Sequence, residues 1–484
     1  MEQQLEVRGA IRLDEFRWQL PRTGGMRVPG LLFADRPLLE QMMSDRTPDQ
    51  VRNAAHLPGI LAASIAMPDA HWGYGLPVGG VVATDEREGV VSPGAVGYDI
   101  GCGVRLLTSR LTRAELASRA ERLADALFAN VPCGVGSHGA VIVKHRELDQ
   151  VLREGSGWAV GRGMGTASDL EHCEEGGVLA GAEPQAVSDG ARERGRDQLG
   201  TLGSGNHFLE VQEVDAVFDA EAARAMGLVV GTVTVMIHCG SRGLGHQVCT
   251  DHVRDVGRKL AGWGIVLPDR QLACAPIRSP EGERYLGAMR AAANFAWANR
   301  QCIADGVRRA FRATLGGGER ETGLMLVYDV AHNIAKFEHH VVGGRRVRCL
   351  VHRKGATRAF PAGHPDVPAV YRALGQPVLV PGDMGRCSYV LRGSAGSMTH
   401  AFGSSCHGAG RRMSRTQAAR ETRGRDLIAE LKAAGVTVRA EGRDTLGEET
   451  SEAYKDVEHV VRVVVGADLA RPVARMRPFI VVKG

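Results

Sequence analysis

Five short segments of this chain place residues that can bind a transition metal among glycines or at the ends of apolar runs. They lie at 97–103, 205–208, 237–243, 331–333 and 406–411. Carboxylate, thiolate and imidazole are the donors that divalent transition metals use, and glycine lets the backbone turn tightly and approach a ligand closely. If the donors serve one site, loops from most of the chain must converge on it. The pattern therefore favours a single complex α+β domain over residues 1–484, and a metal-dependent enzyme that handles phosphates.

The composition is that of an ordinary globular protein with unusually many turns. The chain has 484 residues, of which 63 are glycine, where the usual share is about 7%. The net charge of +5 is modest for this length and implies no uniformly basic surface. The N-terminus is acidic, and no apolar run approaches the ~18 residues of a membrane span. We therefore expect a soluble, cytoplasmic protein without membrane contact.

The cysteines do not form a recognisable framework. Ten of them occur at irregular spacing, without a C-x-x-C pair. This arrangement differs from the disulfide pattern of a secreted domain and from a structural zinc ribbon. We expect most of them to be reduced, small core residues.

Hydrophobic periodicity predicts an irregular mixture of helices and strands. The glycine- and acid-rich stretch 155–181 is expected to be a long surface loop. The helix at 281–315 should support the fold rather than the chemistry, and the helix at 112–130 should begin with Thr112 as N-cap and Glu115 in the capping-box position. Further helices are predicted at 36–55 and 185–198, and strands within 78–107 and at 208–213, 228–237 and 324–330.

Asp99 and Cys102 lie three residues apart between glycines, so one loop could direct both at one ion. Three histidines could supply nitrogen ligands, and five ligands with one thiolate suit two adjacent metals better than one tetrahedral ion. A single histidine is more often a core residue or a strand terminus. The recurrence of His207, His238 and His332 at strand ends and glycine-rich edges favours the metal interpretation.

His407 is flanked by small residues that leave its imidazole accessible, and arginines follow it. An exposed imidazole beside cations and a metal pair could attack a nucleotide α-phosphate and hold it as a phosphoramidate. The residues alone leave three roles open for His407: nucleophile, metal ligand or turn residue.

Two features point less specifically to phosphate or RNA. The glycine-rich loop 200–205 lacks the lysine of a P-loop, and 101–103 lacks the spacing of a dinucleotide-binding fold. The arginine-rich segments 345–358 and 411–425 could neutralise RNA phosphates, although a solvated basic face is the commoner reason for such runs. Aromatic residues make up only 5%, so extensive base stacking is not expected and RNA recognition would rely on the backbone.

Several longer motifs resemble those of the RtcB-type GTP-dependent RNA ligases, the tRNA-splicing ligases. The resemblance runs from about residue 25 to the C-terminus, and the motifs occur in the family's order. They are MPDAHWGYG at 67–75, PGAVGYDIGCG at 93–103, GSGNHFLE at 203–210, HCGSRG at 238–243, DVAHN at 329–333, HRKGATR at 352–358, PGDMG at 381–385 and the segment around His407.

This resemblance implies a role for each site residue. Asp99, Cys102, His207, His238 and His332 would bind two Mn²⁺ ions, with Cys102 bridging them, and His407 would be the nucleophile that takes GMP from GTP. The family's fold is a mixed α+β architecture around a deep metal-binding cleft. The guanosine pocket would be lined by Asn206, Phe208, Glu210, Pro381, Gly382, Asp383, Met384, Ser388, Ala409, Tyr454 and Lys483, with Glu210 and Lys483 reading base edges.

The implied reaction joins RNA ends that carry a 2′,3′-cyclic phosphate or a 3′-phosphate to 5′-hydroxyl ends, in tRNA splicing or RNA repair. It would pass through guanylyl-His407 and an RNA 3′-pp-5′-G intermediate, in a monomer with an archease-type activator as candidate partner. Two alternatives stay open. A metal-dependent 2′,3′-cyclic phosphodiesterase without ligation would need the metals but not His407 or Lys483, and a non-catalytic RNA-binding scaffold would need only the arginines.

Overall fold

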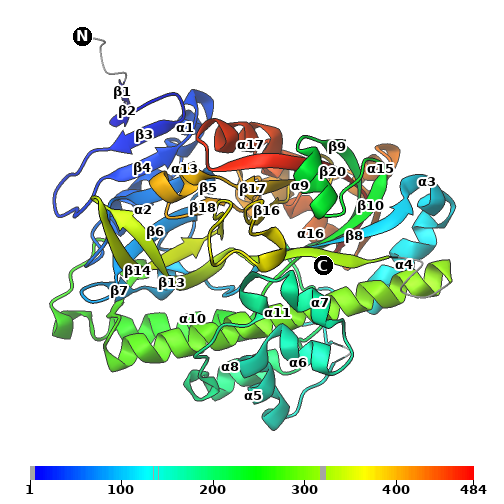
Figure 1. The fold of residues 1–484 in the computed structure, drawn as a ribbon, viewed down its shortest axis with the longest axis horizontal. Coiled ribbons are helices and arrows are strands. Elements are labelled where there is room, and N and C mark those ends of the chain that lie inside the picture. Colours follow the sequence, from blue (N-terminus) through cyan, green and yellow to red (C-terminus); the bar gives the residue numbers. More distant parts are fainter. Residues whose placement is uncertain (1–5, 135, 140, 317–322) are drawn as a thin grey trace.

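Two eight-stranded sheets stand side by side along one long helix (Figure 1). The computed structural model describes residues 6–134, 136–139, 141–316 and 323–484, so residues 1–5 of the acidic N-terminus, on which the prediction of localisation depended, lie outside the described range. The mixture of sheets and helices confirms the predicted α+β class.

The first sheet is built mainly from the N-terminal part of the chain. It is antiparallel except for the parallel pair β4 and β5. Its fifth strand carries Asp69 and ends at His71, two residues that reappear in the site. In spatial order the strands are β1 (Glu6–Val7), β2 (Ala10–Arg12), β3 (Arg17–Leu20), β4 (Gly30–Phe33), β5 (Ser64–His71), β6 (Val78–Asp85), β14 (Arg345–Lys354) and β13 (Asn333–Val342).

The second sheet holds the strands that precede or follow most of the metal-type residues. Its central strands are buried along almost their whole length, as their runs of β-branched residues require. In spatial order they are β12 (Met325–Ala331), β8 (Gly103–Thr112), β10 (Thr232–Cys239), β9 (Phe208–Val217), β20 (Ala470–Lys483), β17 (Ser388–Gly393) and β16 (Pro377–Val380), and β19 (Thr437–Ala440) pairs in parallel with β20.

The chain crosses from the second sheet to the first at His332, the one residue between β12 and β13. The strands of the two sheets therefore alternate in blocks along the chain, and the single domain over residues 1–484 stays a prediction. Two short strand pairs complete the arrangement: β7 (Val90–Val91) with β11 (Ala275–Pro276), and β15 (Ala356–Arg358) with β18 (Ser404–Cys406), which leads directly into His407.

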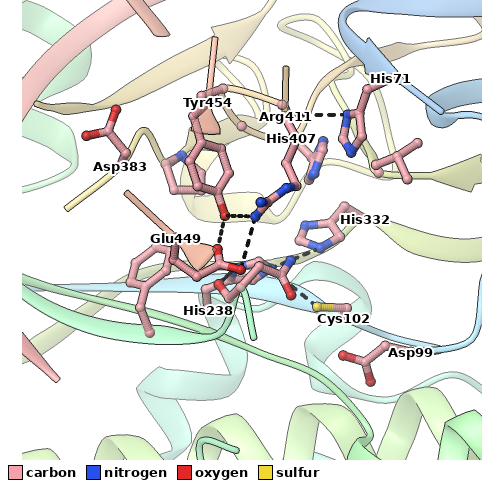
Figure 2. Close-up of a pocket in the computed structure, with 18 of the residues that line it drawn as sticks. His71, Asp99, Cys102, His238, His332, Asp383, His407, Arg411, Glu449 and Tyr454 are labelled. Atoms are coloured by element: carbon pink, nitrogen blue, oxygen red, sulfur yellow. Dashed lines mark hydrogen bonds and ion pairs between the residues drawn. The ribbon is translucent and has the colours of Figure 1, made fainter. Parts of the chain in front are cut away.

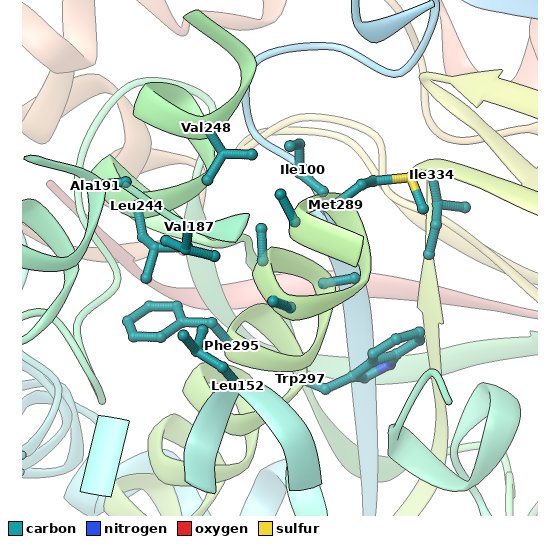
Figure 3. Packing of buried hydrophobic residues seen from close by; sticks show 14 of the residues in the cluster. Ile100, Leu152, Val187, Ala191, Leu244, Val248, Met289, Phe295, Trp297 and Ile334 are labelled. Atoms are coloured by element: carbon teal, nitrogen blue, oxygen red, sulfur yellow. The ribbon is translucent and has the colours of Figure 1, made fainter. Parts of the chain in front are cut away.

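The long helix α11 (Pro280–Leu315) has 36 residues and confirms the helix predicted at 281–315. The hydroxyl of Ser279 accepts the N–H of Gly282 and caps the helix, and proline opens its first turn. Its middle is buried against α10 (Arg242–Gly257) and the loop before β8. The cluster at this contact includes Ile100, Val248, Met289, Phe295 and Trp297 (Figure 3).

Most other element predictions hold with shifted boundaries. The helix predicted at 36–55 is two helices, α1 (Arg36–Met42) and α2 (Thr47–Ala54). Thr112 and Glu115 form the predicted capping box, but a 3₁₀ turn divides the helix that follows into α3 (Arg113–Leu116) and α4 (Ala120–Asn130). The strand predicted at 228–237 begins only at Thr232, after a turn at 230–231.

The prediction of a long surface loop at 155–181 was wrong. The segment forms α6 (Ser156–Gly161), α7 (Ala167–Glu171) and a 3₁₀ turn. Two of its acids are buried in ion pairs: Asp169 pairs with Arg308 at 2.7 Å, and Glu174 pairs with Lys336 at 2.7 Å. The composition of the segment suggested a loop because glycine and acidic residues are common in loops. It could not show that distant cations neutralise the buried carboxylates.

The remaining helices are short; α5 (His145–Glu154) packs on α11, and α8 (Asp189–Gly195) packs on α10. All ten cysteines are buried and free, as predicted. Among the described residues, no helix is both long and apolar enough to cross a bilayer. The helices not yet given are α9 (Ala220–Ala225), α13 (Ala395–His400), α14 (Arg415–Glu421), α15 (Leu427–Ala433), α16 (Arg443–Glu448) and α17 (Val457–Gly466).

Candidate active site and metal centre

The five predicted metal ligands meet at one end of the second sheet. Asp99 and Cys102 lie in the loop that enters β8, His207 directly precedes β9, and His238 is the penultimate residue of β10. His332 follows β12. Because β12, β8, β10 and β9 are consecutive neighbours in the sheet, these chain positions are brought to one edge although they span residues 99–332.

The donor atoms fall into two groups that share one thiolate. Cys102, His238 and His332 form one group, and Asp99, Cys102 and His207 form the other, with the donor atoms of each within 4.8 Å of one another. The Cys102 Sγ lies 3.3 Å from His238 Nε2 and 3.5 Å from His207 Nε2. This arrangement fits two neighbouring divalent metals with Cys102 between them.

Hydrogen bonds orient two of the imidazoles. Nδ1 of His207 lies 3.0 Å from the carbonyl oxygen of Leu202, and Nδ1 of His238 lies 3.0 Å from that of Asn206. A ring that donates from Nδ1 to a carbonyl presents the lone pair of Nε2, which is how metal-binding histidines are commonly held. Nδ1 of His332 is buried without a hydrogen-bond partner among the described residues.

The three imidazoles of the cluster differ in charge state. Against the effect of burial, the neighbouring Cys239, Cys102 and Asp99 raise the pKa of His207 well above its usual value, so a metal bound there would replace a proton. Burial lowers the pKa of His238 and of His332 well below the usual value, so both rings are neutral. Burial, reinforced by the Asp99 carboxylate, raises the pKa of the Cys102 thiol to about 12. A neutral imidazole is the ligating form, and a bound cation would supply the positive charge that favours the thiolate. The residues present therefore fit a transition-metal pair.

His407 stands beside this cluster, with its ring centre 4.9 Å from that of His332 (Figure 2). One carboxylate oxygen of Asp69, from β5 of the first sheet, lies 2.6 Å from His407 Nδ1 and accepts the backbone N–H of His407 at 3.0 Å. Asp69 is fully buried. Nδ1 is thereby occupied by a hydrogen bond, and Nε2 is the ring nitrogen that this carboxylate leaves free.

Most of the predicted guanosine-pocket residues line one cavity of about 280 Å³ together with His407 and four of the metal-type residues. Ser388 does not line it; its hydroxyl accepts the Gly382 N–H at 3.3 Å and so supports the loop that does. His207 does not line it either; its Nε2 lies 2.9 Å from Asp99 Oδ2 and 3.5 Å from Cys102 Sγ. The predicted pocket residues that the structure places on the cavity wall are Asn206, Phe208, Glu210, Pro381, Gly382, Asp383, Met384, Ala409, Tyr454 and Lys483.

The cavity wall carries charges suited to a polar ligand. Burial raises the pKa of Glu210 to about 8, and Lys483 Nζ lies 5.9 Å from the ring centre of Phe208. The buried carboxylate of Glu449 accepts from Tyr454 and Arg411 and lies 3.8 Å from Lys483 (Figure 2).

The sequence patterns gave no role to Asp69, the partner of His407, or to several residues of the cavity wall. Asp69 and His71 lie in the motif 67–75 used for the resemblance, so the motif was a usable signal. Glu449 stands in no motif noted in the sequence, and only its contacts reveal it. Asn333 also lines the cavity without an assigned role, whereas Lys354, Arg411 and Arg415 on the same wall belong to the basic segments predicted to neutralise RNA phosphates.

The interpretation of segment 345–358 as one basic surface was wrong. Arg353 is fully buried, with both carboxylate oxygens of Glu338 as partners at 2.6 and 2.9 Å. Arg358 is buried against Glu175, and Lys354 is also buried. Only the start of the segment is exposed. In segment 411–425, by contrast, five arginines are exposed: Arg412, Arg415, Arg420, Arg423 and Arg425.

Comparison with known proteins supports the resemblance drawn from the motifs. The family described as "tRNA-splicing ligase RtcB" matches residues 50–484. A tRNA-splicing ligase RtcB of Thermococcus kodakarensis is 55% identical over 474 residues, which cover 98% of each chain. One from Archaeoglobus fulgidus is 53% identical over 98% of each chain, and an RNA-splicing ligase RtcB of Mycobacterium tuberculosis is 53% identical over 90% of this chain and 100% of its own. The chain therefore belongs to the RtcB family.

Proposed function

We propose that this chain is an RNA ligase that uses GTP and two Mn²⁺ ions to join a 3′-phosphate or 2′,3′-cyclic phosphate end to a 5′-hydroxyl end. One observation carries the proposal: a single cavity places a carboxylate-oriented histidine, His407, beside two donor groups that share Cys102. The names of the relatives support RNA joining in tRNA splicing.

The first step is guanylylation of His407. Asp69 holds the Nδ1 proton, so the lone pair of Nε2 attacks the α-phosphorus of GTP. The new P–N bond forms as the bond to the β-phosphate oxygen breaks, and pyrophosphate leaves. Glu210 and Lys483 lie on the same cavity wall and would recognise the edges of guanine, while Phe208 packs beneath them.

The metal residues are Asp99, Cys102, His207, His238 and His332. Bound Mn²⁺ would supply positive charge that offsets the negative charge of the triphosphate and of the leaving groups. The protein's own part is to hold three imidazoles and one carboxylate around a single shared cysteine sulfur, with the rings of His207 and His238 oriented by backbone carbonyls.

The later steps return His407 to its starting state. An oxygen of the RNA 3′-phosphate attacks the guanylyl phosphorus, which breaks the P–N bond and gives RNA 3′-pp-5′-G; a 2′,3′-cyclic phosphate is first opened by water. The RNA 5′-hydroxyl then attacks the 3′-phosphorus, and GMP leaves. We propose that the enzyme acts as a cytoplasmic monomer, with an archease-type activator as candidate partner.

The alternative of a cyclic phosphodiesterase without ligation explains less of the geometry. Such an enzyme needs the donor cluster, but it gives no reason for a buried carboxylate that orients His407. The Asp69–His407 pair therefore favours the ligase.

The test uses GTP labelled at the α-phosphate. Wild type should form an acid-labile, alkali-stable protein–GMP adduct, and His407→Gln should form none although it still binds Mn²⁺ and GTP. The same variant should join RNA whose 3′ end already carries GMP, because that step does not use the imidazole. Adduct formation by His407→Gln at the wild-type rate would contradict the proposal.

A further inference from the structure

We propose that Trp72 and Arg46 form a nucleotide-binding rim beside the cavity, in which the Trp72 indole stacks on a nucleobase of the RNA next to the joined ends. This inference rests on the proposed function, because it supplies a binding position for the substrate of the ligase. The ligand class is a single-stranded ribonucleotide: base on the indole, phosphate on the guanidinium.

Trp72 is exposed, although burial of an indole ring would contribute more to the stability of the fold. Its side chain is 57% exposed, whereas Trp18, Trp158 and Trp297 are buried. A large exposed aromatic surface is more often a binding feature than a structural one, since indole stacks on any base through its π-face.

The loop that carries Trp72 is fixed in place. The side-chain amide of the buried Gln50 donates to the carbonyls of Gly73 and Gly75 at 2.7 and 3.0 Å and accepts the Gly73 N–H at 3.0 Å. The N–H of Trp72 itself donates to Asp45 at 3.2 Å. An exposed indole on such a loop is presented in one position before any ligand arrives, which lowers the entropic cost of binding.

Arg46 adds a cation at the same place. Its guanidinium lies 5.8 Å from the centre of the Trp72 ring, and its side chain is exposed. Among the described residues Arg46 makes no ion pair, so its charge is available to a phosphate. The pair thus offers the two contacts that a nucleotide needs, one for the base and one for the backbone.

The rim adjoins the reaction centre. Trp72 directly follows His71, which lines the cavity and lies two residues beyond Asp69, the partner of His407. Further aromatic rings continue from the same loop: Tyr74 meets Tyr98 at 4.9 Å, and Tyr98, on the cavity wall, stacks on the exposed His246 at 4.8 Å. An RNA strand whose end enters the cavity would pass over this rim.

Binding of short RNAs without GTP tests the proposal. One RNA carries a 3′-phosphate and the other a 5′-hydroxyl, and each is made intact and with abasic sites at the two nucleotides nearest the end. Trp72→Leu should weaken binding of one intact RNA by roughly 5- to 150-fold, the range expected for one stacked base. Trp72→Phe should recover most of it, and the loss should vanish with the abasic RNA. The strand that responds identifies which end lies on the rim.

Tryptophan fluorescence gives an independent readout. Intact RNA should quench the emission of wild type, and Trp72→Phe should show less quenching. Phe218→Leu is the matched control, because Phe218 is 52% exposed but lines a different depression. Unchanged binding in Trp72→Leu, or equal weakening for intact and abasic RNA, would contradict the proposal that Trp72 stacks on a nucleobase. Adduct formation with labelled GTP involves no RNA, so its failure in wild type would count against the ligase proposal instead.

Discussion

Cys102 is the residue on which both donor groups depend, because its sulfur is the only atom common to them. Cys102→Ala should therefore lower the metal content of both positions, whereas His332→Ala removes a ligand from one group only. The measurement is Mn²⁺ stoichiometry by equilibrium dialysis, with thermal unfolding as the check on folding. Retention of two tightly bound ions by Cys102→Ala would show that the thiolate does not bridge.

Asp69 should act on His407 without touching the metals. In Asp69→Asn the amide can no longer serve as an anionic acceptor for His407 Nδ1, so the reactive tautomer is lost. We expect adduct formation to slow by about 10²-fold or more, with Mn²⁺ binding unchanged. If the rate fell only because metal was lost, restoring Mn²⁺ to saturation would rescue it, and Asp69 would then have no orienting role.

Some site residues could be found from the sequence because their chemistry is local. Cys102 and His407 stand out as reactive side chains among small residues. Asp69 could not be assigned in the same way, since its role arises from a contact with a residue 338 positions away. The prediction that Arg353 contacts RNA failed for the same reason. The sequence shows its charge, but only the fold shows that this charge is paired with Glu338.

At the scale of elements, α11 does more than the support predicted for it. Asn299, from its buried middle, accepts the N–H of Gly200 at 2.7 Å and donates to the carbonyls of Thr201 and Gly240 at 3.2 and 3.1 Å. Arg300 donates to the carbonyls of Gly101 and Cys239 at 2.7 and 2.9 Å. The helix thereby holds the backbone next to Cys102 and His238 and the glycine-rich loop before His207, a function that hydrophobic periodicity could not indicate.

Asn299→Leu should weaken metal binding by about 10- to 100-fold, the usual effect of losing support behind ligands. The matched control is Asn294→Leu on the same helix, because Asn294 is equally buried but bonds to the backbone of Leu152 and Leu179, away from the ligand loops. Each variant should lose about 1–3 kcal/mol of unfolding free energy per unpaired buried group. Equal metal affinity in the two variants would mean that α11 contributes stability only.

At the scale of the whole molecule, the arginines fall into two classes. Some are buried in ion pairs that stabilise the fold, and others are exposed and available to contact RNA. The net charge of +5 hides this division. Arg353 lies in the first sheet and is fully paired, whereas Arg415 lines the cavity and Arg420 stands exposed on the same helix, α14. The architecture class was predictable from mixed periodicity, but which arginines reach the surface depends on how the two sheets pack.

RNA affinity should therefore fall as the salt concentration rises, and the contacts responsible should come from segment 411–425 rather than from segment 345–358. On a log–log plot the slope for a single strand is about −0.7 per contacted phosphate, so Arg412→Gln and Arg420→Gln should each flatten it by about that amount. Arg258→Gln, exposed at the end of α10, is the control and should leave the slope unchanged. Arg353→Gln should instead lower the unfolding free energy by about 3–5 kcal/mol, because it leaves Glu338 buried without its main partner. A slope that flattens in Arg258→Gln as much as in Arg412→Gln would mean that RNA meets a diffuse field of charge rather than a basic segment beside the cavity.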